Sequence, residues 1–369
     1  MVGVGIIKKC KFTIVETSEI NKISYTCKTF RAAGVLNKQK MKTKIKCFIT
    51  TFVLGVIVTF NANSQIAISN ISEIAKIKSG TTYIAMKDPN SEKAKEYVDA
   101  IRNNWTISKF EFIKYSEIEK FISPENSFLT IGGYETNTQF VKQNADGSRE
   151  NGINFSNTYL YLELWTCKEK YFENKEKKKE FQNSDKIQVA RIDLFTDFES
   201  LADPNKLFQS DYDGNGHIRN WGPGILKNYI QSLMSYLNEG ENRVLNVEVF
   251  NADEMTNLKK EVLYVPEYVL IKFNKFTGDE TQRHDESNIF KHYELKYKLI
   301  SIDELNQKII NDTTSFNYLI YIKSSTDKFI SVINSQTGEM IYSTHTPSSY
   351  NIRSKDVKKL QEKMQDLSY

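Results

Sequence analysis

Cysteine is scarce in this sequence, and so are proline and histidine: the 369 residues include four cysteines, six prolines and four histidines. Three of the cysteines, Cys10, Cys27 and Cys47, precede residue 65, so the remainder of the chain holds Cys167 alone. One cysteine cannot form an internal disulfide, so a buried core must stabilise the fold, and a chain of this length can supply one. Cys167 ends an apolar run without a nearby histidine in sequence, which indicates a structural cysteine and not a catalytic thiol.

Signatures of catalysis are also lacking. The sequence contains no C-x-x-C, H-E-x-x-H or G-x-S-x-G. These absences argue against a disulfide-exchange site, a zinc-protease helix and a nucleophile elbow. The stretch "TIGGYET" (130–136) places two glycines after a strand, but it lacks the lysine and the other glycines of a phosphate-binding loop.

Long hydrophobic runs are missing except for one near the N-terminus, in "MKTKIKCFITTFVLGVIVTFNANSQ" (41–65). Three lysines precede an apolar run of 13 residues, 48–60, and small residues at 62 and 64 follow it. This layout predicts a signal peptide over 41–64, cleaved near Ser64, with an uncleaved anchor as the alternative. The run is short for a membrane span, which needs about 20 residues. Residues 1–40 are then a mis-called extension, and we expect a secreted or periplasmic protein without a membrane span.

Removing residues 1–64 reverses the net charge. The whole chain has 50 basic and 46 acidic residues, and the first 64 hold 11 and 2 of them. The remaining 39 basic and 44 acidic residues give a net charge of −5. A mildly acidic protein has no electrostatic footprint for nucleic acid and no general attraction to anionic membranes.

Hydrophobic periodicity predicts an α/β (or α+β) protein. Runs such as 81–87, 109–115, 158–166 and 186–195 have strand patterns, and the segment 91–105 has a helical apolar face. From Pro223, apolar residues at helical spacing predict a long amphipathic helix that ends before Gly240. The C-terminal half adds strands at 261–273, 293–302 and 316–324, a hairpin at 328–344 and a terminal amphipathic helix.

The two halves resemble each other. "FEFIKYSEIEKFI" (110–122) aligns with "YKLISIDELNQKI" (297–309), and Ser116 and Asp303 fall at the same point as predicted helix caps. We therefore expect two small α/β units with mixed sheets, either as a diverged tandem duplication or as two unrelated uses of a common strand-helix-strand element. The predicted boundaries are 65–205 for the first unit, 206–250 for a glycine-rich turn plus connecting helix, and 251–369 for the second unit.

One stretch has the pattern of a calcium loop. In "DYDGNGHI" (211–218), Asp211, Asp213 and Asn215 occupy ligand positions one, three and five, Gly216 provides the turn at six, and His217 stands at seven. The stretch resembles the loops of EF-hand and dockerin proteins, which implies calcium. Position twelve, however, is glycine in place of the bidentate acid. Two interpretations stay open: a metal site of Asp211, Asp213, Asn215 and His217, or a plain turn without a cofactor.

Two other features are weighed as candidate sites. The loop 279–292 combines acids with His284 and His292, but its spacing matches no known metal-ligand pattern, so a solvated loop is favoured. Trp221, beside two glycines, could stack on a sugar if it were exposed.

The signal-peptide style, with Ala-x-Ser before Gln, and the closing "VINSQTGEMIYS" are similar to uncharacterised secreted or periplasmic proteins of Bacteroidota-type bacteria. The resemblance implies a secreted or periplasmic protein and does not indicate any particular activity. We therefore expect an exported, non-catalytic protein that binds an unknown protein or ligand in the cell envelope or outside it. The alternative is a secreted hydrolase that acts on a polymer, stabilised by calcium and using Asp211 and Asp213.

Overall fold

The structure is a computed structural model. It describes residues 10–15, 22–27, 65–143, 149–173, 181–197, 200, 218–245, 248–274, 277–324 and 327–368, with the backbone alone at 10–15, 22–27 and 135–158. The predicted signal peptide and the predicted calcium loop, 211–217, lie outside the described residues.

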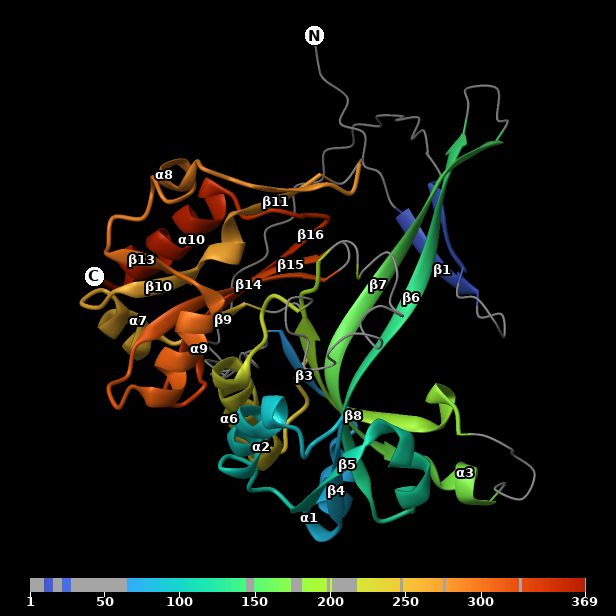
Figure 1. The fold of residues 1–369 in the computed structure, drawn as a ribbon. Helices are drawn as coiled ribbons and strands as arrows, with labels where there is room; N and C mark the ends of the chain where they lie inside the picture. The colour runs from blue at the N-terminus through green and yellow to red at the C-terminus, as the bar shows by residue number, and fades with distance from the viewer. Residues whose placement is uncertain are drawn as a thin grey trace, which may run out of the picture. The chain divides into compact units, whose positions relative to one another are not determined.

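The chain forms two compact units, and Figure 1 traces its course through both. The smaller unit consists of residues 1–61 and 136–156. Its described strands, β1 (Cys10–Val15) and β2 (Lys22–Cys27), pair antiparallel, and β2 pairs in parallel with β6 at Asn137 and Thr138. The larger unit consists of residues 62–135 and 157–369 and contains every element considered below.

The first half of the larger unit is built on six strands, in the order β5-β4-β6-β7-β8-β3, of an eight-stranded sheet that also includes β1 and β2. Its strands are β3 (Ile66–Ile68), β4 (Thr81–Met86), β5 (Lys109–Lys114), β6 (Ser127–Gln143), β7 (Arg149–Cys167) and β8 (Lys186–Leu194), of which β6 and β7 also run through the smaller unit. Its helices are η1 (Ile71–Glu73), α1 (Ile74–Ser79), η2 (Glu92–Ala94), α2 (Lys95–Arg102), η3 (Tyr115–Phe121), α3 (Glu169–Glu173), η4 (Asn183–Asp185) and α6 (Pro223–Glu239).

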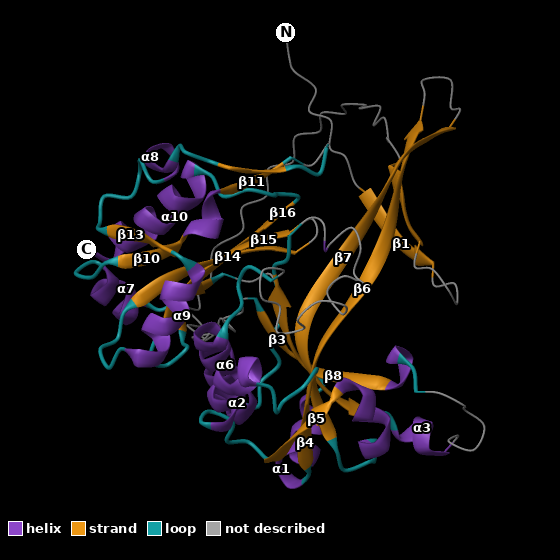
Figure 2. Ribbon diagram, in the orientation of Figure 1, coloured by secondary structure: helices purple, strands orange, loops and turns teal. Residues whose placement is uncertain are grey.

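The second half has a sheet with the strand order β13-β10-β14-β15-β16-β9 and a separate two-stranded ribbon, β11-β12. Its strands are β9 (Val249–Phe250), β10 (Leu263–Pro266), β11 (Ile271–Phe273), β12 (Glu280–Gln282), β13 (Tyr297–Ile300), β14 (Asn317–Ser324), β15 (Asp327–Asn334) and β16 (Met340–Pro347). Its helices are α7 (Ala252–Leu258), η5 (Glu267–Leu270), α8 (Glu286–Ile289), α9 (Ile302–Asn311), α10 (Ser354–Gln365) and η6 (Asp366–Ser368). Figure 2 shows these helices and strands by type. The predicted α/β class, with mixed sheets and a long connecting helix, is confirmed.

The two sheets have the same topology. In the first, β4 pairs in parallel with β5 and β6, and β8 pairs antiparallel with β7 and β3. In the second, β10 pairs in parallel with β13 and β14, and β16 pairs antiparallel with β15 and β9. A helix follows the last hairpin in both halves, α6 in the first and α10 in the second. A duplication would produce this agreement, although the duplication itself stays a prediction.

The register of the two sheets places the halves in correspondence residue by residue. Thr82 of β4 pairs with Phe110 and Ser127, and Leu263 of β10 pairs with Tyr297 and Asn317. This sets Phe110 against Tyr297, which is the alignment expected from the sequence. Six residues further along, Gly133 of β6 corresponds to Lys323 of β14.

The predicted helix caps are wrong by two residues in both halves. Helix α9 begins after Ser301, whose Oγ accepts a hydrogen bond from Glu304 N at 3.1 Å, and not after Asp303. At the equivalent place, η3 begins after Lys114, whose N donates to Glu117 Oε2 at 3.1 Å, and not after Ser116. The parallel strand ends earlier than its apolar run suggested, so the chain turns into the helix sooner.

Helix α6 packs on both sides, whereas α10 packs on one. Eleven of the 17 residues of α6 are buried, among them all seven of the predicted apolar stripe: Ile225, Leu226, Tyr229, Ile230, Leu233, Met234 and Leu237. It contacts α2 in the first half and α9 in the second. In α10 only Val357, Leu360, Gln361 and Met364 are buried. Helix α6 therefore joins the halves, and α10 keeps a polar face toward solvent.

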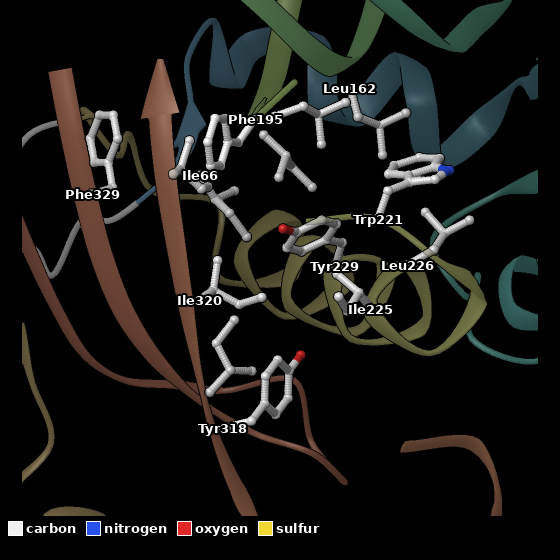
Figure 3. Close-up of a cluster of buried hydrophobic side chains, with 14 of the residues drawn as sticks. Ile66, Leu162, Phe195, Trp221, Ile225, Leu226, Tyr229, Tyr318, Ile320 and Phe329 are labelled. Atoms are coloured by element: carbon white, nitrogen blue, oxygen red, sulfur yellow. The ribbon is translucent and has the colours of Figure 1, made fainter. Parts of the chain in front are cut away.

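Polar side chains fix α6 against the second sheet within the core shown in Figure 3. Tyr318 Oη donates to Asn228 Oδ1 at 2.9 Å, and Asn228 Nδ2 donates to the carbonyl of Ser335 at 2.9 Å. Gly338 has a φ of 71°, and a Cβ there would lie 2.4 Å from the carbonyl oxygen of Asn228. The "TGE" turn therefore needs glycine both for its backbone angle and for the close approach of the helix.

Candidate functional site

Charged side chains from three separate segments meet beside the end of β14. Lys323 is the penultimate residue of β14, Glu280 is the first residue of β12, and Arg219 precedes helix α6. Phe273, the last residue of β11, and Phe195, which follows β8, lie next to them. We refer to these five residues as the Lys323 cluster.

Lys323 is almost completely buried and has no hydrogen bond. Its side chain is 1% exposed, and Nζ lies 3.7 Å from Glu280 Oε1. That separation makes an ion pair but is too long for a hydrogen bond, and neither atom has a hydrogen-bond partner. The ammonium lies 3.5 Å from the ring centroid of Phe273 and 5.4 Å from that of Phe195. It is therefore held by rings and one carboxylate, without hydrogen bonds to stabilise its charge.

The environment lowers the pKa of Lys323. Burial is the largest cause, and the positive charge of Arg219 adds to it, while Glu280 and Asp197 oppose it. The pKa falls from 10.5 to about 8. At pH 7 about a tenth of this amine is therefore neutral, compared with well under 0.1% of an exposed lysine.

Glu280 and Arg219 are fixed by the elements that carry them. Arg219 Nη2 donates to Glu280 Oε2 at 2.6 Å, and its backbone N donates to the carbonyl of Phe195 at 2.6 Å. Glu280 stands opposite Phe273 in the β11-β12 ribbon. The side chain of Asn351 accepts a hydrogen bond from Phe273 N at 2.8 Å and donates one to the carbonyl of Phe273 at 2.9 Å. These two bonds fix the position of the β11-β12 ribbon. Arg219 Nε is buried and has no hydrogen-bond partner.

Polar groups also gather on the other face of the strand end, where the side chain of Ser324 projects. Arg191 Nε donates to Asp193 Oδ1 at 2.6 Å, and burial raises the pKa of Asp193 despite this ion pair. On the neighbouring strands, His345 Nε2 lies 2.9 Å from Asp327 Oδ1. Unlike Lys323, the Arg191–Asp193 and His345–Asp327 pairs are in hydrogen-bonding contact.

The candidates taken from the sequence have different outcomes. Asp211, Asp213, Asn215 and His217 lie outside the described residues, so the calcium site stays a prediction. His284 and His292 are exposed, and Arg283 holds the pKa of Asp285 at about 2 through two hydrogen bonds. In the part of the chain that the structure describes, no group of three or more His, Cys, Asp or Glu residues could hold a metal ion.

Two further candidates are buried. Cys167 ends β7 as a free, buried thiol, and burial raises its pKa to about 12, so it has no thiolate character at neutral pH. Trp221 is 7% exposed and cannot offer its ring to a sugar at the surface. With Tyr97, Ile84 and Leu226 it lines an apolar cavity of about 20 Å³. That volume holds roughly one water molecule, so the cavity is a gap in packing and not a ligand site.

Comparisons of the chain with family models, curated proteins and solved structures found no match. Among the described residues, no helix is both long enough and apolar enough to cross a membrane. Function must therefore be argued from the geometry of the Lys323 cluster.

Proposed function

We propose that this chain is an exported binding protein that holds a small organic anion at the Lys323 cluster. The observation that carries the proposal is the set of buried polar atoms without hydrogen bonds: Lys323 Nζ, Arg219 Nε and Glu280 Oε1. Buried polar groups in proteins almost always have a partner, so three exceptions in one place need a reason. The oxygens of an anion can accept from both nitrogen donors.

Charge favours an anion over a cation. Glu280 is hydrogen-bonded to Arg219 at 2.6 Å, so Lys323 shares this carboxylate and approaches it only to 3.7 Å. A second negative charge would stabilise the ammonium that burial destabilises. Phe273 and Phe195 offer apolar surface to the carbon skeleton of an organic anion, which inorganic phosphate would not use.

The correspondence between the halves indicates that the fold does not require the lysine. The first sheet has the same strand order with Gly133 at the position of Lys323. A lysine that is buried without a hydrogen bond destabilises the folded state. Its presence in the second half alone is therefore better explained by binding than by stability.

The predicted export signal and the absence of known catalytic signatures from the sequence support a binding role over a catalytic one. The alternative of a secreted polymer hydrolase rests on Asp211 and Asp213, which lie outside the described residues, and stays a prediction. No described group favours it.

Melting curves of the purified protein with acetate, pyruvate, lactate or phosphate test the proposal. We expect an organic carboxylate to raise the melting temperature, since a ligand at 100 times its Kd adds about 2.7 kcal/mol of stability. Lys323→Met is expected to abolish the rise. Lys95→Met removes the same charge from a side chain that is 68% exposed and is expected to keep it. An equal rise in wild type and Lys323→Met, or none with any anion, would refute this site.

A further inference from the structure

Two buried lysines stand directly opposite each other in the second sheet. Lys323 of β14 pairs with Lys328 of β15, so their side chains project from the same face. Lys328 is 0% exposed, and its Nζ donates to Asp356 Oδ2 at 2.6 Å and to the carbonyl of Asn351 at 3.1 Å. Lys323 is equally buried but has no hydrogen bond. Both amines are thus buried, but only the amine of Lys328 has hydrogen bonds that stabilise its positive charge.

The surroundings of Lys323 Nζ suit a nucleophile. A neutral amine is nucleophilic and an ammonium is not, and desolvation together with a neighbouring cation favours the neutral form. Lys323 has both, with two aromatic rings within 5.4 Å of its ammonium and the charge of Arg219 nearby. Glu280 Oε1, 3.7 Å away and without a hydrogen bond, is placed to accept a proton from the amine and to return it.

We propose that Lys323 captures small α-keto acids covalently, as an imine, with Arg219 holding their carboxylate. This deepens the proposed function and rests on it, because the same cluster must first bind the anion. An α-keto acid places a carbonyl carbon one bond from a carboxylate, which fits an amine within electrostatic reach of a guanidinium whose Nε has no hydrogen bond.

The step needs no oxidant or reductant. The lone pair of Nζ forms a bond to the keto carbon, and the C=O π pair moves onto the keto oxygen. Glu280 relays both protons of the attacking nitrogen to that oxygen: the first makes it a hydroxyl, and the second lets it leave as water when the C=N bond forms. The products are one imine and one water, and hydrolysis reverses the reaction.

Borohydride trapping tests the proposal. The purified protein is incubated with pyruvate and sodium cyanoborohydride at pH 8, and peptide mass spectrometry locates each modified lysine. At this pH about half of an amine with a pKa near 8 is neutral, compared with well under 1% of an exposed lysine. We expect modification at Lys323 on the order of tenfold faster than at any exposed lysine, and none at Lys328.

Two controls separate the outcomes. Lactate has the carboxylate but no carbonyl, so it is expected to raise the melting temperature without forming an adduct. Lys323→Arg keeps the charge and is expected to lose the fast adduct. Modification spread over the lysines according to exposure, or equal at Lys323 and Lys328, would overturn the imine. If pyruvate raises the melting temperature and no adduct forms at Lys323, the imine is wrong and the binding site stands. If neither occurs, both are wrong.

Discussion

Lys328→Met is expected to lower the free energy of unfolding by about 3–5 kcal/mol. Lys328 and Asp356 form a buried ion pair in which the side chains are 0% and 8% exposed. Removing the lysine leaves the carboxylate without its counter-charge. The backbone N of Arg353, which donates to Asp356 Oδ2 at 2.8 Å, offsets only part of that loss. Methionine fills most of the volume of the lysine stem, so the loss reports on charge and not on a cavity.

Lys323→Met is the matched control, since it removes the opposite residue from the same face. Glu280 keeps Arg219 after this change, so no carboxylate loses its hydrogen-bonded partner. We expect stability at pH 7 to be unchanged or to rise by about 1–3 kcal/mol. Urea unfolding followed by circular dichroism measures both variants. If both variants lost a comparable free energy of unfolding, the charge of Lys323 would have stabilising partners in the folded state, which contradicts the geometry described above.

The stability difference between wild type and Lys323→Met is expected to change with pH. The folded protein releases the proton of Lys323 near pH 8, and the unfolded chain releases it near pH 10.5. Between these values the unfolded state binds more protons, so the stability of the wild type rises with pH relative to the variant. Below pH 8 the lysine is charged in both states and destabilises the fold.

The size of this effect follows from the two pKa values. Their separation corresponds to about 3 kcal/mol. We expect the wild type to gain this free energy of unfolding relative to the variant gradually between pH 8 and about 10.5. Unfolding of the two proteins in parallel at pH 7, 8, 9 and 10 isolates the contribution of Lys323, because tyrosines and other lysines titrate in both. A difference that stays constant over this range would show that the amine has an ordinary pKa in the folded protein.

Local pattern was enough to predict much of the fold. The stripe of α6 was clear because its apolar residues recur at helical spacing and Pro223 and Gly240 bound it. The strand 158–166 has apolar residues on both faces, and Leu162 and Trp165 are accordingly both buried. The correspondence of the halves was visible at 110–122 and 297–309 because strand, turn and helix follow there within 13 residues.

The Lys323 cluster could not be predicted in the same way. A lysine at the end of the apolar run "FNYLIYIKS" has the pattern of a strand that emerges into solvent. Its burial depends on Phe273 and Glu280, which lie more than 40 residues earlier, and on Phe195 and Arg219, which lie more than 100 earlier. Glu280 was visible only as one acid in a polar loop. Nothing in local spacing indicates that these segments meet.

The ionisation of Lys323 tests the account most directly. With lysine side chains labelled with ¹³C at Cε, the resonance that disappears in Lys323→Arg identifies this residue, and its shift can be followed from pH 6 to 11. We expect a midpoint of about 8, well below those of the exposed lysines. A midpoint near 10.5 would contradict it, because the amine would then be solvated or hydrogen-bonded and neither a binding nor a reactive role would follow from its position.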